Sequence, residues 1–364
     1  MLCTGARILL ESLKREGVDL FFGYPGAVID IYDELSNHPD LRHILVRHEQ
    51  GAVHAADGYA RACGKVGVCL ATSGPGATNT VTGIATAYSD SIPMVIFTGQ
   101  VSTPLIGNDA FQEVDIIGIT RPCTKHNFLV KDVKDLAETV RKAFYLARSG
   151  RPGPVLVDIP KNIQQASCEF VWPEDVVMRS YCPTFRANLN QLRRAMDVLV
   201  TSRKPLIVAG GGVIMANAAE ELCTLAHLMH APVCSTLMGL GAFPGDDPLW
   251  IGMLGMHGTF AANRAVTQAD VILAVGARFD DRVTGKLSQF APNARIVHID
   301  IDPTTLRKNV RVEVPVVSDA LSALQGLRSI LESGHAQKDW AGDHADWMGQ
   351  VLEWQKEHPL SWAK

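Results

Sequence analysis

Three glycine-rich turns are the segments of this sequence best suited to holding a cofactor. They are GYPGA at 23–27, SGPGATN at 73–79 and GGGV at 210–213, and each follows a short apolar run that predicts a β-strand. A glycine turn lets the backbone come close to an anionic group, and the helix after it presents its positive end. The turns therefore predict binding sites for phosphate-bearing cofactors.

The turns are a poor match to the motif that binds a nicotinamide dinucleotide. Asn79 and Met215 stand where the third glycine of the G-x-G-x-x-G fingerprint belongs, and no acidic residue follows at the ribose-binding spacing. The Gly285-Lys286 pair does not complete a P-loop, because Asp280 replaces its first glycine and Leu287 its hydroxyl residue. The turns favour neither of these nucleotide motifs.

Glu49 has two competing interpretations. It lies in RHEQGAVHAADGYAR, between a predicted strand, HILV at 43–46, and a helix with alanines on its inner side. A carboxylate that opens a helix commonly interacts with the helix dipole. At the carboxyl end of a parallel strand it also stands where doubly wound sheets bind ligands, so a role in a ligand site is the alternative.

The elements that must position these residues alternate between short β-branched runs and helical patterns. This alternation indicates an α/β protein with parallel sheets. We predict two doubly wound parallel-sheet domains, 1–163 and 187–333, joined by an aperiodic connector at 164–186. One unbroken helix is expected after the second glycine turn, over 76–89.

The segment 334–364 carries tryptophans at a spacing that could place them on one helix face. They predict a surface that packs either on a partner or back on this chain. These residues are Trp340, Trp347, Trp354 and Trp362.

Composition and charge exclude several classes of protein. The 364 residues are 47% hydrophobic and carry 34 Lys and Arg against 38 Asp and Glu, so the net charge of −4 offers no basic field to nucleic acid. No apolar run reaches the roughly 18 residues of a membrane span, and no secretory leader precedes the first predicted helix. We expect no membrane association and a cytoplasmic location.

Cysteine and histidine usage gives no strong metal motif. Eight cysteines are scattered without a C-x-x-C pair, which predicts reduced core thiols. His227 and His230 could face one metal ion, but they end a predicted helix, where histidine commonly meets the dipole. We therefore predict no metal ligands in this chain.

A series of motifs points to a known family. In order they are GYPG, RHEQGAVHAADGYARA, ATSGPGATN, IPMVIFTGQV, DAFQEVDI, TKHNFLV, RPGPVLVDIPK, GMLGMHGT and GARFDDRVTGK. With them the sequence resembles the acetolactate synthase (acetohydroxyacid synthase) family of large catalytic subunits, over residues 4 to about 325. Several of the motifs occur across thiamine-diphosphate enzymes, but TGQV, DAFQEVDI and MLGMHGT followed by GARFDDRVTG are together specific to this family.

The resemblance implies decarboxylation of pyruvate and its carboligation to a second pyruvate or to 2-oxobutyrate, in branched-chain amino-acid biosynthesis. It implies thiamine diphosphate, Mg²⁺ and a structural FAD as cofactors. It also implies a homodimer or homotetramer, and a small regulatory subunit as a further partner. The first domain would bind the pyrimidine of thiamine diphosphate and the second would bind FAD.

The resemblance also implies roles for individual residues of the first domain. Glu49 would protonate the pyrimidine nitrogen N1′. Phe111 would lie near the reacting carbonyls, and the alternative is that it is an ordinary aromatic residue of the core. Gln112 and Glu113 follow Phe111 in the family's order, which favours a place near the reacting carbonyls. The implied catalytic residues are Glu49, Phe111, Gln112 and Lys161, and the residues implied to bind thiamine diphosphate are Gly26, Pro75 and Asn79.

The positions implied to line FAD are mostly glycines, charged residues and strand ends of the second domain. Glycine backbones and arginines suit a pyrophosphate, and an acidic residue that ends a strand can bind a ribose. These positions are Arg151, Gly210, Gly211, Gly212, Thr236, Leu237, Met238, Leu254, Gly255, Met256, His257, Gly276, Ala277, Arg278, Asp280, Arg282, Asp300, Ile301, Asp319 and Ala320.

Two features depart from the family pattern. The turn GYPGA has one glycine fewer than usual, with Asp30 near the usual proline, so the loop over the cofactor is expected to differ. The G-D-G motif that holds metal and diphosphate in the family's third domain is absent from this sequence. We therefore expect 334–364 to lead to a missing third domain, and the chain alone to make no acetolactate.

Two alternative functions remain open from the sequence. Another thiamine-diphosphate carboligase or decarboxylase, such as glyoxylate carboligase, is one, although that enzyme carries an apolar residue at the position of Glu49. The other is a non-catalytic FAD- or nucleotide-binding module.

Overall fold

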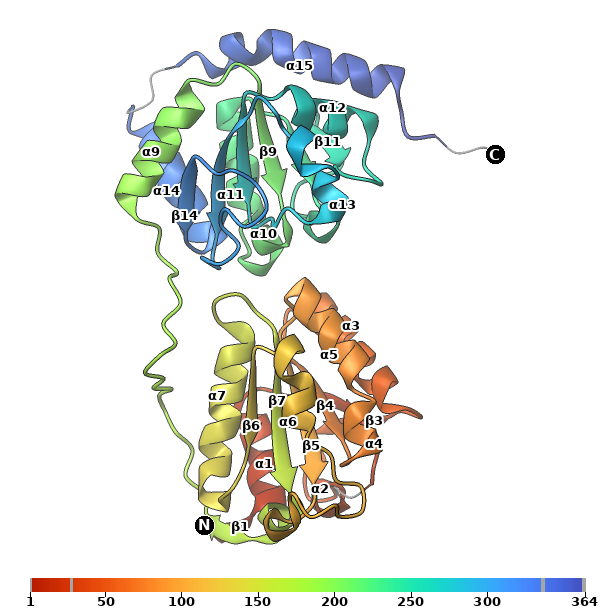
Figure 1. The fold of residues 1–364 in the computed structure, drawn as a ribbon. Coiled ribbons are helices and arrows are strands. Elements are labelled where there is room, and N and C mark those ends of the chain that lie inside the picture. The colour runs from red at the N-terminus through yellow and green to blue at the C-terminus, as the bar shows by residue number, and fades with distance from the viewer. Residues whose placement is uncertain (1, 27–28, 335–337, 362–364) are drawn as a thin grey trace. The chain divides into compact units, whose positions relative to one another are not determined.

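The computed structural model describes residues 2–26, 29–334 and 338–361. Its chain divides into two units, Met1–Cys182 and Pro183–Lys364. Each unit contains one six-stranded parallel sheet with helices on both faces, as Figure 1 shows. The prediction of two doubly wound α/β domains is confirmed.

The sheet of the first unit has the strand order β3-β2-β4-β5-β7-β6, and all neighbouring strands are parallel. Strands β4 and β5 are buried at every residue, which matches the apolar sequence GVCLA of β4 and the apolar residues MVIF that begin β5. The strands are β2 Leu20–Gly23, β3 Arg42–Leu45, β4 Gly67–Ala71, β5 Met94–Gln100, β6 His126–Leu129 and β7 Pro154–Pro160.

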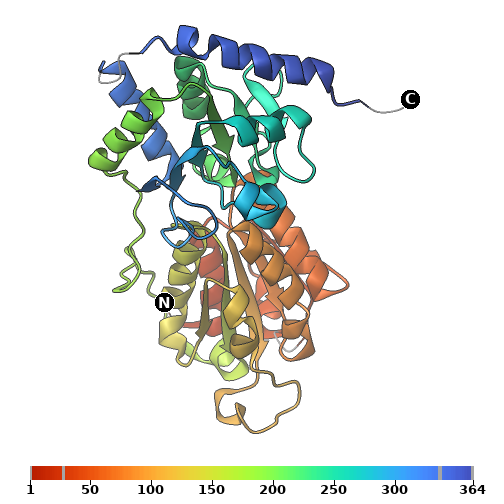
Figure 2. The same ribbon diagram turned by 45° about the horizontal axis from the view of Figure 1, so that its top comes forward.

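Helices cover both faces of this sheet (Figure 2). On one face, α1 and α7 pack on alternate strand residues such as Val95 and Val157, whereas α3 packs against β4 and α5 on the other. The helices are α1 Gly5–Arg15, α2 Ile29–Leu35, α3 Glu49–Cys63, α4 Pro75–Thr78, α5 Val81–Asp90, α6 Ile116–Thr120, α7 Leu136–Arg148 and α8 Lys161–Gln165.

The sheet of the second unit has the order β11-β10-β9-β12-β13-β14. Numbered within the unit, this is the order 3-2-1-4-5-6 of dinucleotide-binding folds, whose direction of winding changes between the first and fourth strands. That change falls between β9 and β12. The strands are β9 Pro205–Ala209, β10 Val233–Ser235, β11 Trp250–Met253, β12 Val271–Val275, β13 Arg295–Asp300 and β14 Val314–Val317.

Two cores flank the second sheet. Ile207 and Leu273 face the helices α9, α11 and α14, whereas Leu206 and Ile272 face α12 and part of α15. The helices are α9 Leu189–Val200, α10 Gly211–Met215, α11 Ala219–Met229, α12 Phe260–Gln268, α13 Asp281–Thr284, α14 Ala320–Glu332 and α15 Trp340–Glu357.

The tryptophan-rich segment packs back on this chain. Trp340, Trp347 and Trp354 are buried in the two cores of the second unit, and the Trp347 Nε1–H donates to the Pro205 carbonyl at 2.9 Å. Trp362 lies outside the described residues. Of the two predicted interpretations, packing on this chain is the one that holds for the three described tryptophans.

The structure differs from the sequence prediction in three local features. The expected helix over 76–89 is divided into α4 and α5 around Asn79 and Thr80. Part of the expected connector forms β8, Ser167–Glu169, which pairs antiparallel with β1, Leu2–Thr4. Cys63 and Cys182 are exposed, so the prediction that the cysteines are core thiols is wrong for these two, although all eight are free.

No helix in the described part of the chain is long and apolar enough to cross a membrane.

Candidate active site

Glu49 begins α3 directly after β3 and is only 7% exposed. Its Oε2 accepts a hydrogen bond from Asn79 Nδ2 at 2.9 Å. Asn79 ends α4, which follows β4, so the contact joins two neighbouring regions at the carboxyl edge of the sheet. The Glu49 carboxylate also helps to raise the pKa of the Tyr32 hydroxyl, although burial is the larger cause. The structure thus places a buried, hydrogen-bonded carboxylate where doubly wound sheets bind ligands.

The space beside this carboxylate is narrow, and glycine is the residue that fits there. A Cβ added at Gly76 would lie 2.4 Å from Thr72 Cγ2 and 3.0 Å from Glu49 Oε1. A Cβ added at Gly26 would lie 2.6 Å from the Thr72 side chain. The first two glycine turns therefore meet on either side of Thr72, next to Glu49. Ala27, the last residue of the shortened GYPGA turn, lies outside the described residues.

Asp30, at the position of the usual proline, is in the first turn of α2. Its Oδ1 accepts a hydrogen bond from Gln165 Nε2 at 3.2 Å. An acidic residue suits the first turn of a helix because it interacts favourably with the dipole. The change from the family pattern at this position is therefore accommodated by the start of α2.

Phe111 and Gln112 lie on the segment 101–115, which follows β5 and extends from the sheet edge (Figure 2). Phe111 is 87% exposed, so its interpretation as an ordinary core aromatic is wrong. Gln112 has a φ of 58°, and its carbonyl oxygen would lie 2.6 Å from a Cβ added at Gly74. Gln112 therefore adjoins the second glycine turn, whose Pro75 begins α4.

A buried polar network anchors the base of this segment. Asp158 Oδ1 accepts a hydrogen bond from Thr98 Oγ1 at 2.7 Å, and Asp158 Oδ2 accepts one from Gln100 Nε2 at 3.0 Å. Gln100 Nε2 also donates to the Val114 carbonyl at 2.9 Å. Burial raises the pKa of Asp158 to about 7, against the opposing effect of the two hydrogen bonds. These residues were not predicted from the sequence, although a carboxylate near the end of a buried strand was a usable signal.

Lys161 is exposed and is the first residue of α8, directly after β7. Its neighbour Asn162 binds Thr103 twice: Asn162 Oδ1 accepts from Thr103 N and Asn162 Nδ2 donates to Thr103 Oγ1, both at 2.9 Å. Thr103 belongs to the segment that carries Phe111. All seven residues predicted for catalysis or thiamine diphosphate therefore follow carboxyl ends of strands in one sheet.

The positions predicted to bind FAD, Arg151 excepted, follow the carboxyl ends of all six strands of the second sheet. The backbone turns come closest to one another at the change of winding, after β9 and β12. A Cβ added at Gly210 would lie 2.0 Å from the Gly276 carbonyl oxygen, and one added at Gly212 would lie 2.7 Å from Gly276 Cα. Only glycine allows these two turns to pack so closely.

Charged side chains and a third turn complete this edge of the second sheet. Arg278 Nη2 lies 3.4 Å from Asp280 Oδ2, and Asp280 Oδ1 accepts hydrogen bonds from the backbone of α13. Met256 N donates to the Arg282 carbonyl at 2.8 Å, which holds the 254–257 turn beside α13. Asp319 is different: its Oδ1 accepts from Leu321 N at 2.9 Å and so caps α14.

Arg151 does not join the other predicted residues of its own unit. It precedes β7, and its Nε donates to Ser91 Oγ at 2.8 Å, before β5. This is the amino edge of the first sheet, opposite the edge that carries Glu49.

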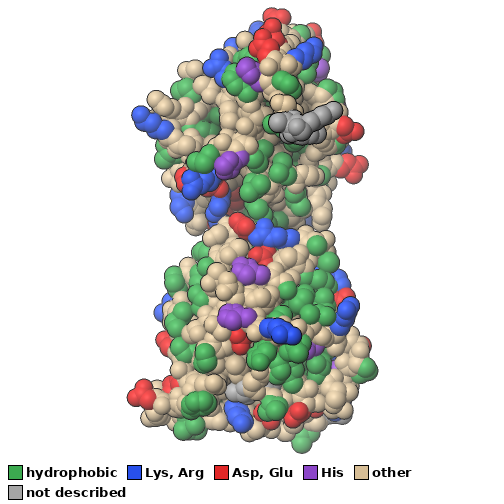
Figure 3. All heavy atoms as spheres, turned by 90° about the vertical axis from the view of Figure 1, so that its right-hand side faces the viewer, with side chains coloured by type: hydrophobic (Ala, Val, Ile, Leu, Met, Phe, Trp, Pro, Cys, Tyr) green, Lys and Arg blue, Asp and Glu red, His purple; other side chains and the backbone are tan. Residues whose placement is uncertain are grey.

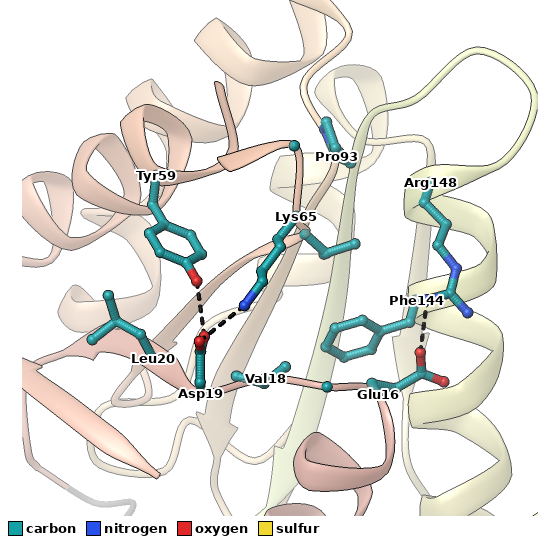
Figure 4. A pocket seen from close by; sticks show the side chains of 12 residues that line it. Glu16, Val18, Asp19, Leu20, Tyr59, Lys65, Pro93, Phe144 and Arg148 are labelled. Atoms are coloured by element: carbon teal, nitrogen blue, oxygen red, sulfur yellow. Dashed lines mark hydrogen bonds and ion pairs between the residues drawn. The ribbon is translucent and has the colours of Figure 1, made fainter. Parts of the chain in front are cut away.

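A cavity of about 270 Å³ also lies at the amino edge of the first sheet (Figure 4). Figure 4 shows Asp19 between Tyr59 and Lys65, whose Oη and Nζ donate to its carboxylate at 2.8 and 2.9 Å. Arg148 Nη1 lies 3.0 Å from Glu16 Oε2 on the other side. Its charged groups are paired with one another, and the cavity is separate from the Glu49 edge.

Comparison with known proteins matches one family domain to part of each unit. The N-terminal thiamine pyrophosphate-binding domain of thiamine pyrophosphate enzymes matches residues 3–119, and the central domain of these enzymes matches residues 192–327. Thiamine pyrophosphate is another name for thiamine diphosphate. The two matched regions contain Glu49 and the Gly210–Gly276 approach respectively.

Several curated relatives are similar over nearly the whole chain. The acetolactate synthase isozyme 3 large subunit of Escherichia coli is 51% identical over 99% of this chain. The acetolactate synthase large subunit of Haemophilus influenzae is 49% identical over 99%, and the probable large subunit of Methanocaldococcus jannaschii is 50% identical over 97%. The chain spans 63%, 63% and 59% of the lengths of these relatives. The chain therefore belongs to the thiamine pyrophosphate enzymes, with the N-terminal and central domains of that family and acetolactate synthase large subunits among its relatives.

Proposed function

We propose that this chain provides the first two domains of an acetolactate synthase large subunit. The activity would decarboxylate pyruvate and join the product to a second pyruvate or to 2-oxobutyrate, in branched-chain amino-acid biosynthesis. The observation that carries the proposal is the buried Glu49 carboxylate at the carboxyl edge of the first sheet, held by Asn79. The identity of about 50% to acetolactate synthase large subunits supports the choice of reaction.

The residues around Glu49 fit the pyrimidine end of thiamine diphosphate. When bound, this cofactor supplies a carbon nucleophile that adds to a 2-oxoacid and stabilises the charge left after loss of CO₂. Glu49 would hold the proton at the pyrimidine nitrogen N1′, and the hydrogen bond from Asn79 would fix the direction of its carboxylate. Gly76 leaves the space beside Glu49 Oε1 free of a side chain. Pro75 and Gly26 would line the same space.

The catalytic candidates outside this space would act on the substrate. Phe111 and Lys161 are both exposed, on segments joined by the Asn162–Thr103 hydrogen bonds. An exposed ammonium group suits the carboxylate of an incoming 2-oxoacid, and an exposed aromatic ring can exclude water when substrate is present. Gln112 would contribute polar contacts to the reacting carbonyl.

We propose FAD as the ligand of the second unit. Support comes from the order of the strands and from the Gly210–Gly276 approach, because dinucleotides bind at such a change of winding. Arg278 would contact the pyrophosphate, and Asp300 would bind a ribose or the adenine. Arg151 stays a proposed FAD contact on the family resemblance alone.

The remaining proposals concern ions, partners and location. Mg²⁺ is proposed as a further cofactor from the family resemblance, and no residue of this sequence is assigned to hold it. A homodimer or homotetramer, a small regulatory subunit and a cytoplasmic location follow from the family resemblance.

Figure 3 shows hydrophobic side chains gathered on one face of the first unit, and exposed apolar residues of this unit include Leu45 and Tyr88. Such a surface would suit pairing with a second subunit.

A chimaeric enzyme tests the proposed reaction. This chain would replace the matching 63% of the Escherichia coli isozyme 3 large subunit, which is 51% identical to it. With thiamine diphosphate, Mg²⁺ and FAD, the chimaera should form acetolactate from pyruvate. Glu49→Gln should lower the rate about 100-fold or more, because the amide cannot supply the proton. The exposed Glu353→Gln is the matched control and should leave the rate unchanged.

Two outcomes would count against the proposal. A folded, FAD-containing chimaera that makes no acetolactate would refute the assigned reaction, and a fully active Glu49→Gln chimaera would refute the assigned role. FAD binding by the 364-residue chain can be followed separately by flavin fluorescence quenching. Arg278→Ala should weaken it by about tenfold or more, because a charge-assisted contact is lost. Unchanged affinity would remove Arg278 from the FAD site.

A further inference from the structure

The outer face of α11 carries a cluster of three side chains that belongs to neither cofactor site. Cys223 and His227 are four residues apart, so they lie on one face of the helix. Asp247 comes from the connection that precedes β11 and reaches the same face. The candidate ligand atoms of the three residues, one from each, all lie within 4.8 Å of one another.

Asp247 is held in place by its own surroundings. Its Oδ1 accepts a hydrogen bond from Leu249 N at 2.9 Å, and its Oδ2 lies 2.8 Å from His227 Nε2. The Asp247 side chain is 13% exposed, Cys223 is half-buried and the His227 side chain is 51% exposed. Two of the three groups are thus partly sheltered, while the histidine leaves the cluster open to solvent and to an entering ion.

We propose that Cys223, His227 and Asp247 bind one divalent transition-metal ion, with Zn²⁺ the best match. A thiolate, an imidazole and a carboxylate form a mixed set that suits Zn²⁺ or Co²⁺, whereas Mg²⁺ and Ca²⁺ prefer oxygen ligands. Zinc commonly has four ligands in a tetrahedron, so water would take the fourth position. The site differs in chemistry from the proposed Mg²⁺ site and does not depend on the proposed function.

Metal binding would replace the hydrogen bond between His227 and Asp247. The imidazole Nε2 must be free of its proton to bind a metal ion, and the thiol must lose its proton as well. Burial and the Asp247 charge raise the pKa of the Cys223 thiol in the metal-free protein. A bound cation reverses that charge balance, because a thiol that coordinates a metal ion is deprotonated. Metal binding should therefore strengthen with rising pH and release protons.

The location indicates a structural role for the ion. Asp247 precedes β11, and α11 ends before β10, so the cluster lies at the amino edge of the second sheet. The proposed FAD residues follow the carboxyl ends of the same strands. An ion at this cluster would join α11 to the connection before β11 and would leave the cofactor edge untouched.

Cobalt titration of the chelator-treated 364-residue chain tests the proposal. Co²⁺ bound in a tetrahedral site with a thiolate ligand absorbs visible light, so the titration reports both stoichiometry and the presence of sulfur. We expect saturation at about one equivalent and displacement of the absorbance by Zn²⁺ but not by Mg²⁺. Cys223→Ser and His227→Ala should each weaken Co²⁺ binding by about tenfold or more.

The matched control is Cys182→Ser, which removes an exposed thiol in the first unit. It should leave Co²⁺ binding unchanged. Circular dichroism would establish that each variant is folded. Asp247→Asn is a further ligand variant, because its Oδ1 can still accept the hydrogen bond from Leu249 N. Absence of saturable binding, or binding that Cys223→Ser and His227→Ala leave unchanged, would overturn the proposal. So would binding that is lost in Cys182→Ser, because it would arise from another thiol.

Discussion

Gly210→Ala probes the approach of two turns at the proposed FAD site. Gly210 has extended backbone angles, φ −102° and ψ 179°, which alanine adopts without strain. The effect of the substitution is therefore purely steric. The added Cβ would lie 2.0 Å from the Gly276 carbonyl oxygen and 2.5 Å from the Gly276 carbonyl carbon. Both atoms belong to the backbone, so no side chain can rotate away to relieve the contact.

The size of the effect follows from the cost of overpacking. Inserting a methyl group into a packed site costs about 1–3 kcal/mol, and a clash with backbone atoms should reach the upper value. For a unit of this size, about 3 kcal/mol lowers the unfolding temperature of the second unit by roughly 6–12 °C. Thermal unfolding measured by calorimetry, together with an FAD titration, should show both lower stability and weaker FAD binding.

Two further alanine variants make the comparison quantitative. Gly211→Ala places its Cβ 3.1 Å from Met238 Cβ and 3.3 Å from the Met238 carbonyl oxygen, contacts much longer than those at Gly210, so its effect should be smaller. Gly349→Ala lies in α15 with open space around it, and alanine favours a helix by about 0.5–1 kcal/mol, so this variant should be slightly more stable. If Gly210→Ala unfolds within about 2 °C of the wild type and binds FAD equally well, the close packing of the two turns is refuted.

Two other predictions concern buried side chains. The pKa of Asp158 is about 7 in the folded protein against 3.8 ordinarily, so the folded state holds a proton that the unfolded state has lost between these values. The free energy of unfolding should therefore fall by up to about 1.4 kcal/mol per pH unit from pH 4 to 7. Urea unfolding should show a smaller fall for Asp158→Asn, and equal slopes would contradict the assignment. Trp347→Ala should cost about 3–5 kcal/mol, because Trp347 is 2% exposed, whereas the more exposed Leu352→Ala should cost much less. Equal losses for these two variants would show that α15 does not depend on its buried tryptophans.

The sequence identified most strands because of the way parallel sheets are buried. Strands β4 and β5 are covered on both faces, so residues 67–71 and 94–97 form nearly continuous apolar runs that are visible in the sequence. Strands β6, β11 and β14 were not predicted, because His126–Leu129, Trp250–Met253 and Val314–Val317 are short and only partly buried. The glycine turns were visible in the sequence because two backbone segments can pack this closely only where one of them has glycine. This requirement holds whichever segment the glycine turn packs against.

Which residues meet was decided by the tertiary structure. The sequence selected Glu49 and Asn79 as separate positions, and their 2.9 Å contact arises because β3 and β4 both flank β2 in the sheet. Arg151 and Glu49 were both predicted to serve cofactors, but Arg151 precedes β7 at the amino edge of the sheet whereas Glu49 follows β3 at the carboxyl edge. Cys223 and Asp247 are brought together by the chain that passes between α11 and β11. Composition and local pattern specify which segments are strands and turns, but contacts between distant residues depend on the order in which strands pair, which no local pattern encodes.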